Sequence, residues 1–122
     1  MTENTPSLKI KLEGSKKFLQ NADLKAANLE GADLQGAELG GADMRGANLK
    51  KIFLSEAKIA KANLSEANLT EANLSGADLT DTNLSGKDLS GMDLTGTKLV
   101  GADLTNADLS GVNLSNTDVT DT

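Results

Sequence analysis

The chain has 122 residues, with 12 Lys and Arg against 18 Asp and Glu, and a net charge of −6 at pH 7. This length suits a single domain with one continuous core. The sequence contains no Cys and no His, which excludes a disulfide framework and removes the commonest general base and metal ligand. With two Phe and no Trp or Tyr, it favours a thin core of identical layers over an irregular globular core.

Residues 1–16 precede any regular pattern. Leu8, Ile10 and Leu12 alternate with lysines, which is typical of a short strand. Because a stack of layers must cover its end layer, we expect this leader to cap the first layer. The leader has no apolar stretch long enough for a signal peptide, and no segment of the chain has the length and apolarity of a membrane span. We therefore expect a cytoplasmic location.

Residues 17–121 repeat a five-residue unit without a break in phase. The central residue is apolar at every fifth position from Leu19 to Val119, and it is Leu at 18 of 21 centres. Ala stands two residues before the centre in 13 units, Asp or Asn stands directly before it in 16, and Gly stands two residues after it in 10. Short polar side chains form local hydrogen bonds at turns, so we interpret the Asp and Asn positions as structural.

A period of five suits neither regular secondary structure. On an α-helix it advances by about 140° per step, so the leucines would wind around every face. On a flat strand an odd step points successive leucines to opposite sides. The pattern becomes consistent if the chain bends once per unit, with Ala and Leu inward and Gly at a corner that needs positive φ. Such coils would stack at about 4.8 Å, and the number of units per coil stays open.

Two stretches, ANLSEANLTEANLSGADL (62–79) and GADLTNADLSGVNL (101–114), resemble the pentapeptide-repeat family. This resemblance implies an all-β fold, a right-handed parallel quadrilateral β-helix of about five coils with four units per coil. With twenty residues per coil, one outward column alternates in sign, which suits a stack because like charges directly opposite each other are destabilising. The column contains Glu38, Lys58, Asp78, Lys98 and Asp118.

Several inward positions depart from alanine. Lys87 stands between Ala67 and Ala107 in its column, where an unpaired ammonium would be costly to bury. We expect its stem to extend to solvent or the corner beside it to bulge. Three larger apolar residues share another alanine column, which we interpret as an enlargement of the core: Ile52, Met92 and Val112.

The unit Lys50-Lys51-Ile52-Phe53-Leu54 is the most irregular one. Phe53 stands where Asp or Asn belongs, so we expect it to point outward in the column of Asp33 and Asn73. An exposed aromatic ring among cations is typical of an anchor for a protein partner, although single exposed apolar residues are also common. Further cations stack on a neighbouring face, and the candidate interaction residues are therefore Lys25, Arg45, Lys50, Lys51 and Phe53.

These features disfavour an enzyme and predict no cofactor and no bound metal. Every unit keeps its length, so no insertion forms a pocket, and no His or Cys is available for catalysis. Acidity and the lack of stacking aromatics disfavour direct nucleic-acid binding. The leading interpretation is a non-catalytic binding or scaffold protein that presents flat faces to a protein partner. No capping segment follows Val119, so we also hypothesise weak self-association through the last coil.

An alternative follows from the family resemblance and the distribution of charge. Residues 1–61 contain ten Lys and Arg against eight Asp and Glu, whereas residues 62–122 contain two against ten. The second half thus has a net charge of −8. Some pentapeptide-repeat proteins present an acidic, DNA-like rod to type II topoisomerases, which makes an inhibitor or protector of such an enzyme the alternative function. The leucine centres differ from the phenylalanines common in those members.

Overall fold

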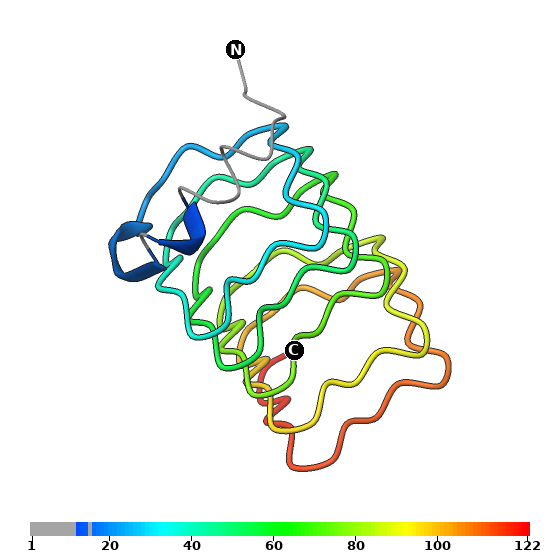
Figure 1. The fold of residues 1–122 in the computed structure, drawn as a ribbon. Helices are drawn as coiled ribbons and strands as arrows, with labels where there is room; N and C mark the ends of the chain where they lie inside the picture. The colour runs from blue at the N-terminus through cyan, green and yellow to red at the C-terminus, as the bar shows by residue number, and fades with distance from the viewer. Residues whose placement is uncertain (1–11, 15) are drawn as a thin grey trace.

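The computed structural model describes residues 12–14 and 16–122, and the chain in it winds into stacked square coils (Figure 1). Among the described residues, Leu12 and Glu13 are helical, although the alternation before them suggested a strand, and a short 3-10 helix, η1 (Lys16–Phe18), follows. The coils are joined by isolated parallel bridges between residues twenty positions apart, such as Asp23 with Asp43 and Lys98 with Asp118. This register confirms the right-handed parallel quadrilateral β-helix with four pentapeptides per coil.

Each coil has four faces, and each face carries one unit per coil. Face 1 contains the centres Leu19, Leu39, Ile59, Leu79, Leu99 and Val119. Face 2 contains Leu24, Met44, Leu64, Leu84 and Leu104. Face 3 contains Leu29, Leu49, Leu69, Leu89 and Leu109, and face 4 contains Leu34, Leu54, Leu74, Leu94 and Leu114.

The core is a column of layers in which the central residue and the residue two before it point inward. Leu29, Ala32 and Leu34 are fully buried, and the same alternation of buried and exposed residues continues through most of the stack. Ile52 and Met92 are buried at inward alanine positions, as expected for an enlarged core, and Val112 packs against the core from a partly buried position. Each layer therefore buries its apolar side chains only by stacking on its neighbours.

The geometry of the corners explains why glycine recurs two residues after the centre of the unit. The residue two positions after each centre has a φ between 56° and 72°, whether it is Gly or not. The residue after that donates its N–H to the carbonyl of the centre, as Ala32 does to Leu29 at 3.0 Å. This hydrogen bond, with positive φ at the second of the two central residues alone, is the geometry of a type II β-turn. Glycine recurs there because it adopts positive φ without steric cost.

The Asp and Asn side chains fasten these turns from outside. The side-chain oxygen of Asn63 accepts the amide N–H of Ser65 at 3.0 Å and its hydroxyl at 2.7 Å. Asp108 makes the same two bonds with Ser110. Since these polar groups are used locally and identically in many units, the interpretation that they are structural is confirmed.

Residues just before the first coil cover part of its edge. Leu12 is buried in the core cluster. The carboxylate of Glu13 accepts the amide N–H of Asp33 at 2.7 Å, and the carbonyl of Lys16 accepts that of Glu38 at 2.8 Å. These bonds replace those that a preceding coil would supply. Leu8 and Ile10 lie outside the described residues, so the cap expected for the whole of residues 1–16 stays a prediction.

Candidate interaction sites

The residues Lys50, Lys51 and Phe53, called here the Phe53 patch, lie at the corner between faces 3 and 4 and on face 4. Phe53 forms parallel bridges with Asp33 and Asn73, as its column requires. Its ring is 44 % exposed, although its backbone is fully integrated in the stack. Lys50 is partly buried at the corner, and Lys51 is exposed with a φ of 58°. The patch therefore combines an exposed ring with two cations from a single unit.

Arg45 and Lys25 do not join the Phe53 patch. They stack twenty residues apart at the corner between faces 2 and 3, so the width of face 3 separates them from Phe53. The guanidinium of Arg45 turns back onto face 2, where it forms an ion pair with Asp43 at 2.7 Å. The structure thus brings together three of the five candidate interaction residues.

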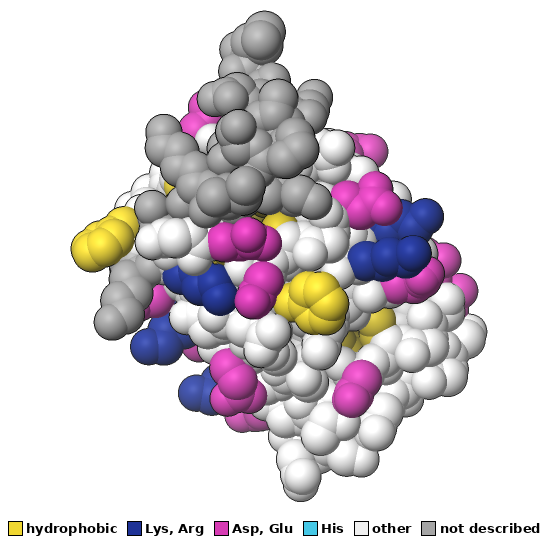
Figure 2. Space-filling view, viewed as in Figure 1, with side chains coloured by type: hydrophobic (Ala, Val, Ile, Leu, Met, Phe, Trp, Pro, Cys, Tyr) yellow, Lys and Arg dark blue, Asp and Glu magenta, His cyan; other side chains and the backbone are white. Residues whose placement is uncertain are grey.

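Charge is distributed unevenly along the stack. In the view of Figure 2, dark blue Lys and Arg side chains lie over the upper and middle coils, whereas the lowest coils show none. The N-terminal coils are uppermost in this view. The net charge of −8 carried by residues 62–122 is consequently concentrated at one end of the rod, and the field of that end favours cationic partners.

The alternating column on face 1 is stacked as expected, but its charges are not paired directly. Parallel bridges join Lys58 to Asp78 and Asp78 to Lys98. Within the described chain, no ion pair forms between members of this column. The carboxylates of Asp78 and Asp118 instead accept hydrogen bonds from the threonine two residues later. Alternation here avoids repulsion between like charges rather than forming salt bridges.

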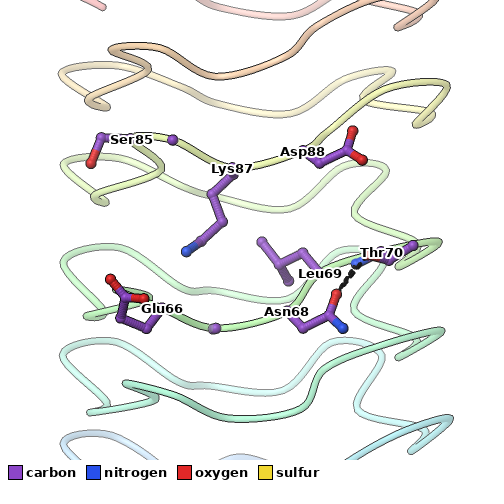
Figure 3. A pocket seen from close by; sticks show the side chains of 9 residues that line it. Glu66, Asn68, Leu69, Thr70, Ser85, Lys87 and Asp88 are labelled. Atoms are coloured by element: carbon purple, nitrogen blue, oxygen red, sulfur yellow. Dashed lines mark hydrogen bonds between the residues drawn. The ribbon is translucent and has the colours of Figure 1, made fainter.

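Lys87 remains inside the fold. Its side chain is only 8 % exposed, and it projects between two coils into a cavity of about 320 Å³ (Figure 3). Burial lowers the pKa of Lys87, and the nearby carboxylate of Glu66 partly offsets this shift. The corner before it keeps its turn, because the amide of Lys87 still donates to the carbonyl of Leu84 at 3.3 Å. The expected bulge of the corner is therefore wrong, and the ammonium reaches solvent only through the cavity between the coils.

The coils themselves have separated instead. The amides of Asn68 and Asp108 donate to the preceding coil, at 3.0 and 2.9 Å. In the described chain, no such bond is made by Asn83, Asp88 and Asp93, which also lack bridges to the residues twenty positions earlier. We call this gap, between residues 62–74 and 83–94 on faces 2, 3 and 4, the slit. Figure 3 shows the two coils at Lys87 standing further apart than the coils beside them.

Face 1 remains closed and joins the two halves of the stack. The amide of Gly76 donates to Thr95 at 2.8 Å, and that of Leu79 donates to Lys98 at 2.7 Å. The bridge between Asp78 and Lys98 is also present. The slit therefore opens around three sides of the coil and closes at a fourth side with a regular hydrogen-bond ladder.

Charge, rather than size alone, accounts for the slit. Ile52 also replaces an inward Ala, yet it is fully buried and its carbonyl accepts the amide of Asn73 at 2.9 Å. Thr97 is buried on face 1, where its hydroxyl donates to the carbonyl of Leu94 at 2.9 Å. Lys87 has three donors and no hydrogen-bond partner in the described chain. An ammonium in this position is stabilised by opening the ladder to water.

Sequence reasoning singled out Lys87 but missed the slit. A signal was present, because four successive inward positions depart from alanine, at Thr82, Lys87, Met92 and Thr97. The first three lie on faces 2, 3 and 4, where the ladder is lost, whereas Thr97 lies on face 1, where the ladder is kept. The run alone therefore does not mark the open faces, and the informative member is the charged one, Lys87.

Within the described residues, no group of His, Cys, Asp or Glu is placed to hold a metal ion. The same residues contain no helix with the length and apolar character needed to cross a bilayer.

Comparison with known proteins identifies the repeat. The family model for Pentapeptide repeats matches residues 19–51, 54–86 and 88–122, in 8 copies. A crystal structure of a pentapeptide repeat protein from the Arabidopsis thaliana thylakoid lumen has 27 % identity and a TM-score of 0.63, over 87 % of this chain and 68 % of that one. The plasmid-mediated fluoroquinolone resistance protein QnrB1 has 17 % identity and a TM-score of 0.52, over 84 % and 72 %. No curated protein matches the chain.

Proposed function

Because the chain belongs to the pentapeptide repeat family, we propose that it is a non-catalytic scaffold that binds a protein partner through its flat faces. The observation that carries this proposal is the Phe53 patch. Phe53 places a 44 % exposed ring where most other units carry Asp or Asn. Exposed aromatic anchors beside cations are frequent centres of protein interfaces.

The geometry of the patch supports binding to a flat, acidic protein surface. The ring stands on a regular stack, so little conformational entropy is lost when a partner packs against it. Lys50 and Lys51 supply positive charge beside the ring, while Asp33 and Asn73 border it along its column. The unit therefore offers one apolar anchor with a polar rim, which is the usual arrangement of a small interface.

Quantitative capture of partners from the native host tests this role. We expect Phe53→Asp to reduce recovery of the specific partner at least tenfold, because it removes the anchor and adds a repelling charge. Asn113→Asp, three coils further along the same column, is the matched control and is expected to leave recovery unchanged. Equal recovery with wild type, Phe53→Asp and a Lys50→Glu/Lys51→Glu variant would disprove the role of the patch.

A second function is supported by the concentration of negative charge in residues 62–122. An acidic rod can compete with DNA for a cationic groove, which would make the chain an inhibitor or protector of a type II topoisomerase. The assay is DNA supercoiling by gyrase with increasing amounts of the protein. Inhibition or protection that weakens when Asp103 and Asp108 are changed to Asn would support this function, and supercoiling unaffected by excess protein would exclude it.

A further inference from the structure

The described residues contain three buried polar side chains, and Lys87 alone has no hydrogen-bond partner. The other two, Thr82 and Thr97, each donate to a backbone carbonyl, at 2.7 and 2.9 Å. The Lys87 side chain is more than nine-tenths buried and points into the slit. Its Nζ still touches solvent, because no fully enclosed side-chain nitrogen or oxygen lacks a partner. An ammonium so placed offers its free donors to an anionic group that enters the slit.

The walls of the slit present main-chain groups rather than side chains alone. In the coil before, the amide of Leu49 donates to Asn68 at 2.8 Å, and in the coil after, the amide of Leu89 donates to Asp108 at 2.9 Å. The equivalent amide of Leu69 and the carbonyl of Asp88 face the slit and make no such bond in the described chain. The wall above and the wall below are thus two strand edges with alternating donors and acceptors.

A polypeptide main chain is the chemical group that matches two such edges. It supplies donors and acceptors alternately at the spacing of a strand, and strand addition to an open edge is a recurrent mode of peptide recognition. A carboxylate on the same segment would pair with the Lys87 ammonium, which is the one cation among the residues that line the cavity, where Glu66 and Asp88 are the acidic members. This local pair acts against the negative field of residues 62–122. Burial lowers the pKa of Lys87, and the nearby carboxylate of Glu66 partly offsets this fall.

The slit also limits which peptide fits. Leu69 and Leu89 behind it are almost fully buried, so a residue that faces inward must be Gly or Ala. One face is five residues long, which leaves about 10 Å of straight edge, or about three residues of pairing. A second cavity of about 200 Å³ continues toward face 4 between Thr70 and Met92, so the segment can extend past the corner.

We propose that the slit binds an extended peptide segment with small inward residues, whose carboxylate pairs with Lys87 and whose main chain pairs with the open edges on face 3. This site rests on the proposed scaffold function and adds a second point of contact to it. The Phe53 patch lies on face 4 and on an earlier coil, so the two contacts can be tested separately.

The test uses the full ¹⁵N-labelled chain and the peptide acetyl-Thr-Gly-Thr-Gly with a free carboxylate, compared with the same peptide carrying a C-terminal amide. We expect saturable shifts of the amide resonances of Leu69 and Asp88, with half-saturation at about 1 mM peptide. The amide-terminated peptide should bind at least tenfold more weakly. No saturable shift with the free acid, or equal binding of both peptides, would overturn the proposal.

Lys87→Met is the decisive variant and Lys98→Met, on face 1, is its matched control. Lys87→Met should abolish the peptide-dependent shifts and slow the hydrogen exchange of Leu69 and Asp88 at least tenfold, because the ladder closes. Lys98→Met should change neither. The proposed site would be disproved if, in the free protein, the amide hydrogen of Leu69 exchanges as slowly as that of Leu49. It would also be disproved if the peptide-dependent amide shifts persist in Lys87→Met.

The peptide site and the scaffold function fail in different ways. If peptide binding is absent while Phe53→Asp still abolishes partner capture, the slit site is wrong and the scaffold function stands. If the peptide binds through Lys87 while partner capture is insensitive to both the Phe53 patch and Lys87→Met, the scaffold function is wrong.

Discussion

The guanidinium of Arg45 donates two hydrogen bonds to the carboxylate of Asp43, from Nε at 2.9 Å and from Nη2 at 2.7 Å. These side-chain bonds are the main reason that the pKa of Asp43 is lowered to about 2, and the backbone amide of Arg45 adds to the effect. The Arg45 guanidinium is thus held on face 2 by its ion pair with Asp43, which is why it does not contribute to the Phe53 patch.

Arg45→Ala should therefore raise the pKa of Asp43 toward the ordinary value for Asp, because the charged form loses its strongest donors. The change can be followed by NMR of the side-chain carboxyl carbon during an acid titration. Lys25→Ala is the control, since Lys25 acts on Asp43 only through the weaker Coulombic interaction. A pKa that stays near 2 after removal of Arg45 would contradict this account.

Acid should destabilise the fold by protonating the aspartates whose carboxylates accept hydrogen bonds from turn residues. The pKa values of Asp93, Asp103, Asp108 and Asp118 are lowered, first because the hydroxyl two residues later donates to each carboxylate. The unfolded chain then binds more protons on acidification, so this stabilisation is complete above the ordinary Asp pKa of about 4 and is lost as pH falls through the folded values. Urea denaturation should show constant stability from about pH 5 to 7 and a loss between about pH 4 and 2. A free energy of unfolding that stays constant or rises between about pH 4 and 2 would refute this role of the aspartates.

Removing the charge at Lys87 should stabilise the protein. Lys87→Met is expected to raise the free energy of unfolding at pH 7 by about 2 kcal/mol, because the desolvated ammonium is lost and the ladder can close. Burial lowers the folded pKa of Lys87 below its ordinary value, so the wild type is penalised while the lysine is charged. This penalty disappears as pH rises from the lowered folded pKa to the unfolded value near 10.5.

The stability difference between Lys87→Met and wild type should consequently shrink between pH 7 and alkaline pH. Chemical denaturation at several pH values measures it, with exposed Lys98→Met as the control. A variant less stable than wild type, or a difference independent of pH, would show that the ammonium does not hold the slit open.

Replacing the adjacent residues Ala26 and Ala27 by glycine should change the stability of the fold in opposite directions. Ala26 is exposed at a corner with a φ of 56°, where an L-residue is strained by roughly 1–2 kcal/mol. Ala26→Gly should therefore stabilise the fold by roughly 0.5 kcal/mol, after the greater entropy of the unfolded chain is counted. Ala27 is fully buried, so Ala27→Gly should destabilise by about 1 kcal/mol. Denaturation midpoints that fall equally for both variants would contradict the corner geometry.

The last coil provides a test of self-association. Leu114 is 42 % exposed and Val119 is 47 % exposed, whereas the corresponding Leu94 and Leu99 in the preceding coil are buried. Burying these residues against a second copy would remove apolar surface from water, so light scattering should show a mass that rises with concentration. Leu114→Lys should keep the protein monomeric, and exposed Lys25→Ala should have no effect. A strict monomer at high concentration would exclude association through this coil.

Much of the fold could be predicted because each unit repeats the same arrangement of inward, outward and corner residues. Leu29 and Ala32 are inward, Gly31 is at a corner, and Asp33 fastens the next turn, in every case as the period of five indicates. The outward position of Phe53 followed from the same register. Its grouping with Lys50 and Lys51 is local in sequence, so it too could be predicted. The separation of Arg45 depended on a side-chain rotation toward Asp43, which no periodicity specifies.

The sequence by itself determined which residues of each unit point inward, point outward or form the corner, because a strictly periodic chain can bury its leucines and satisfy its backbone in one repeating way. The four units per coil are shown by the register of the stacked bridges. Only the tertiary structure decided what happens at Lys87. There the chain could have moved the side chain, the corner or the whole coil, and each response costs a different set of hydrogen bonds. The structure retains the turns of residues 64–67 and 84–87, which are local, and opens the ladder between coils. Opening of the ladder depends on contacts between coils on faces 2, 3 and 4 together. These contacts cannot be inferred from single positions along the sequence.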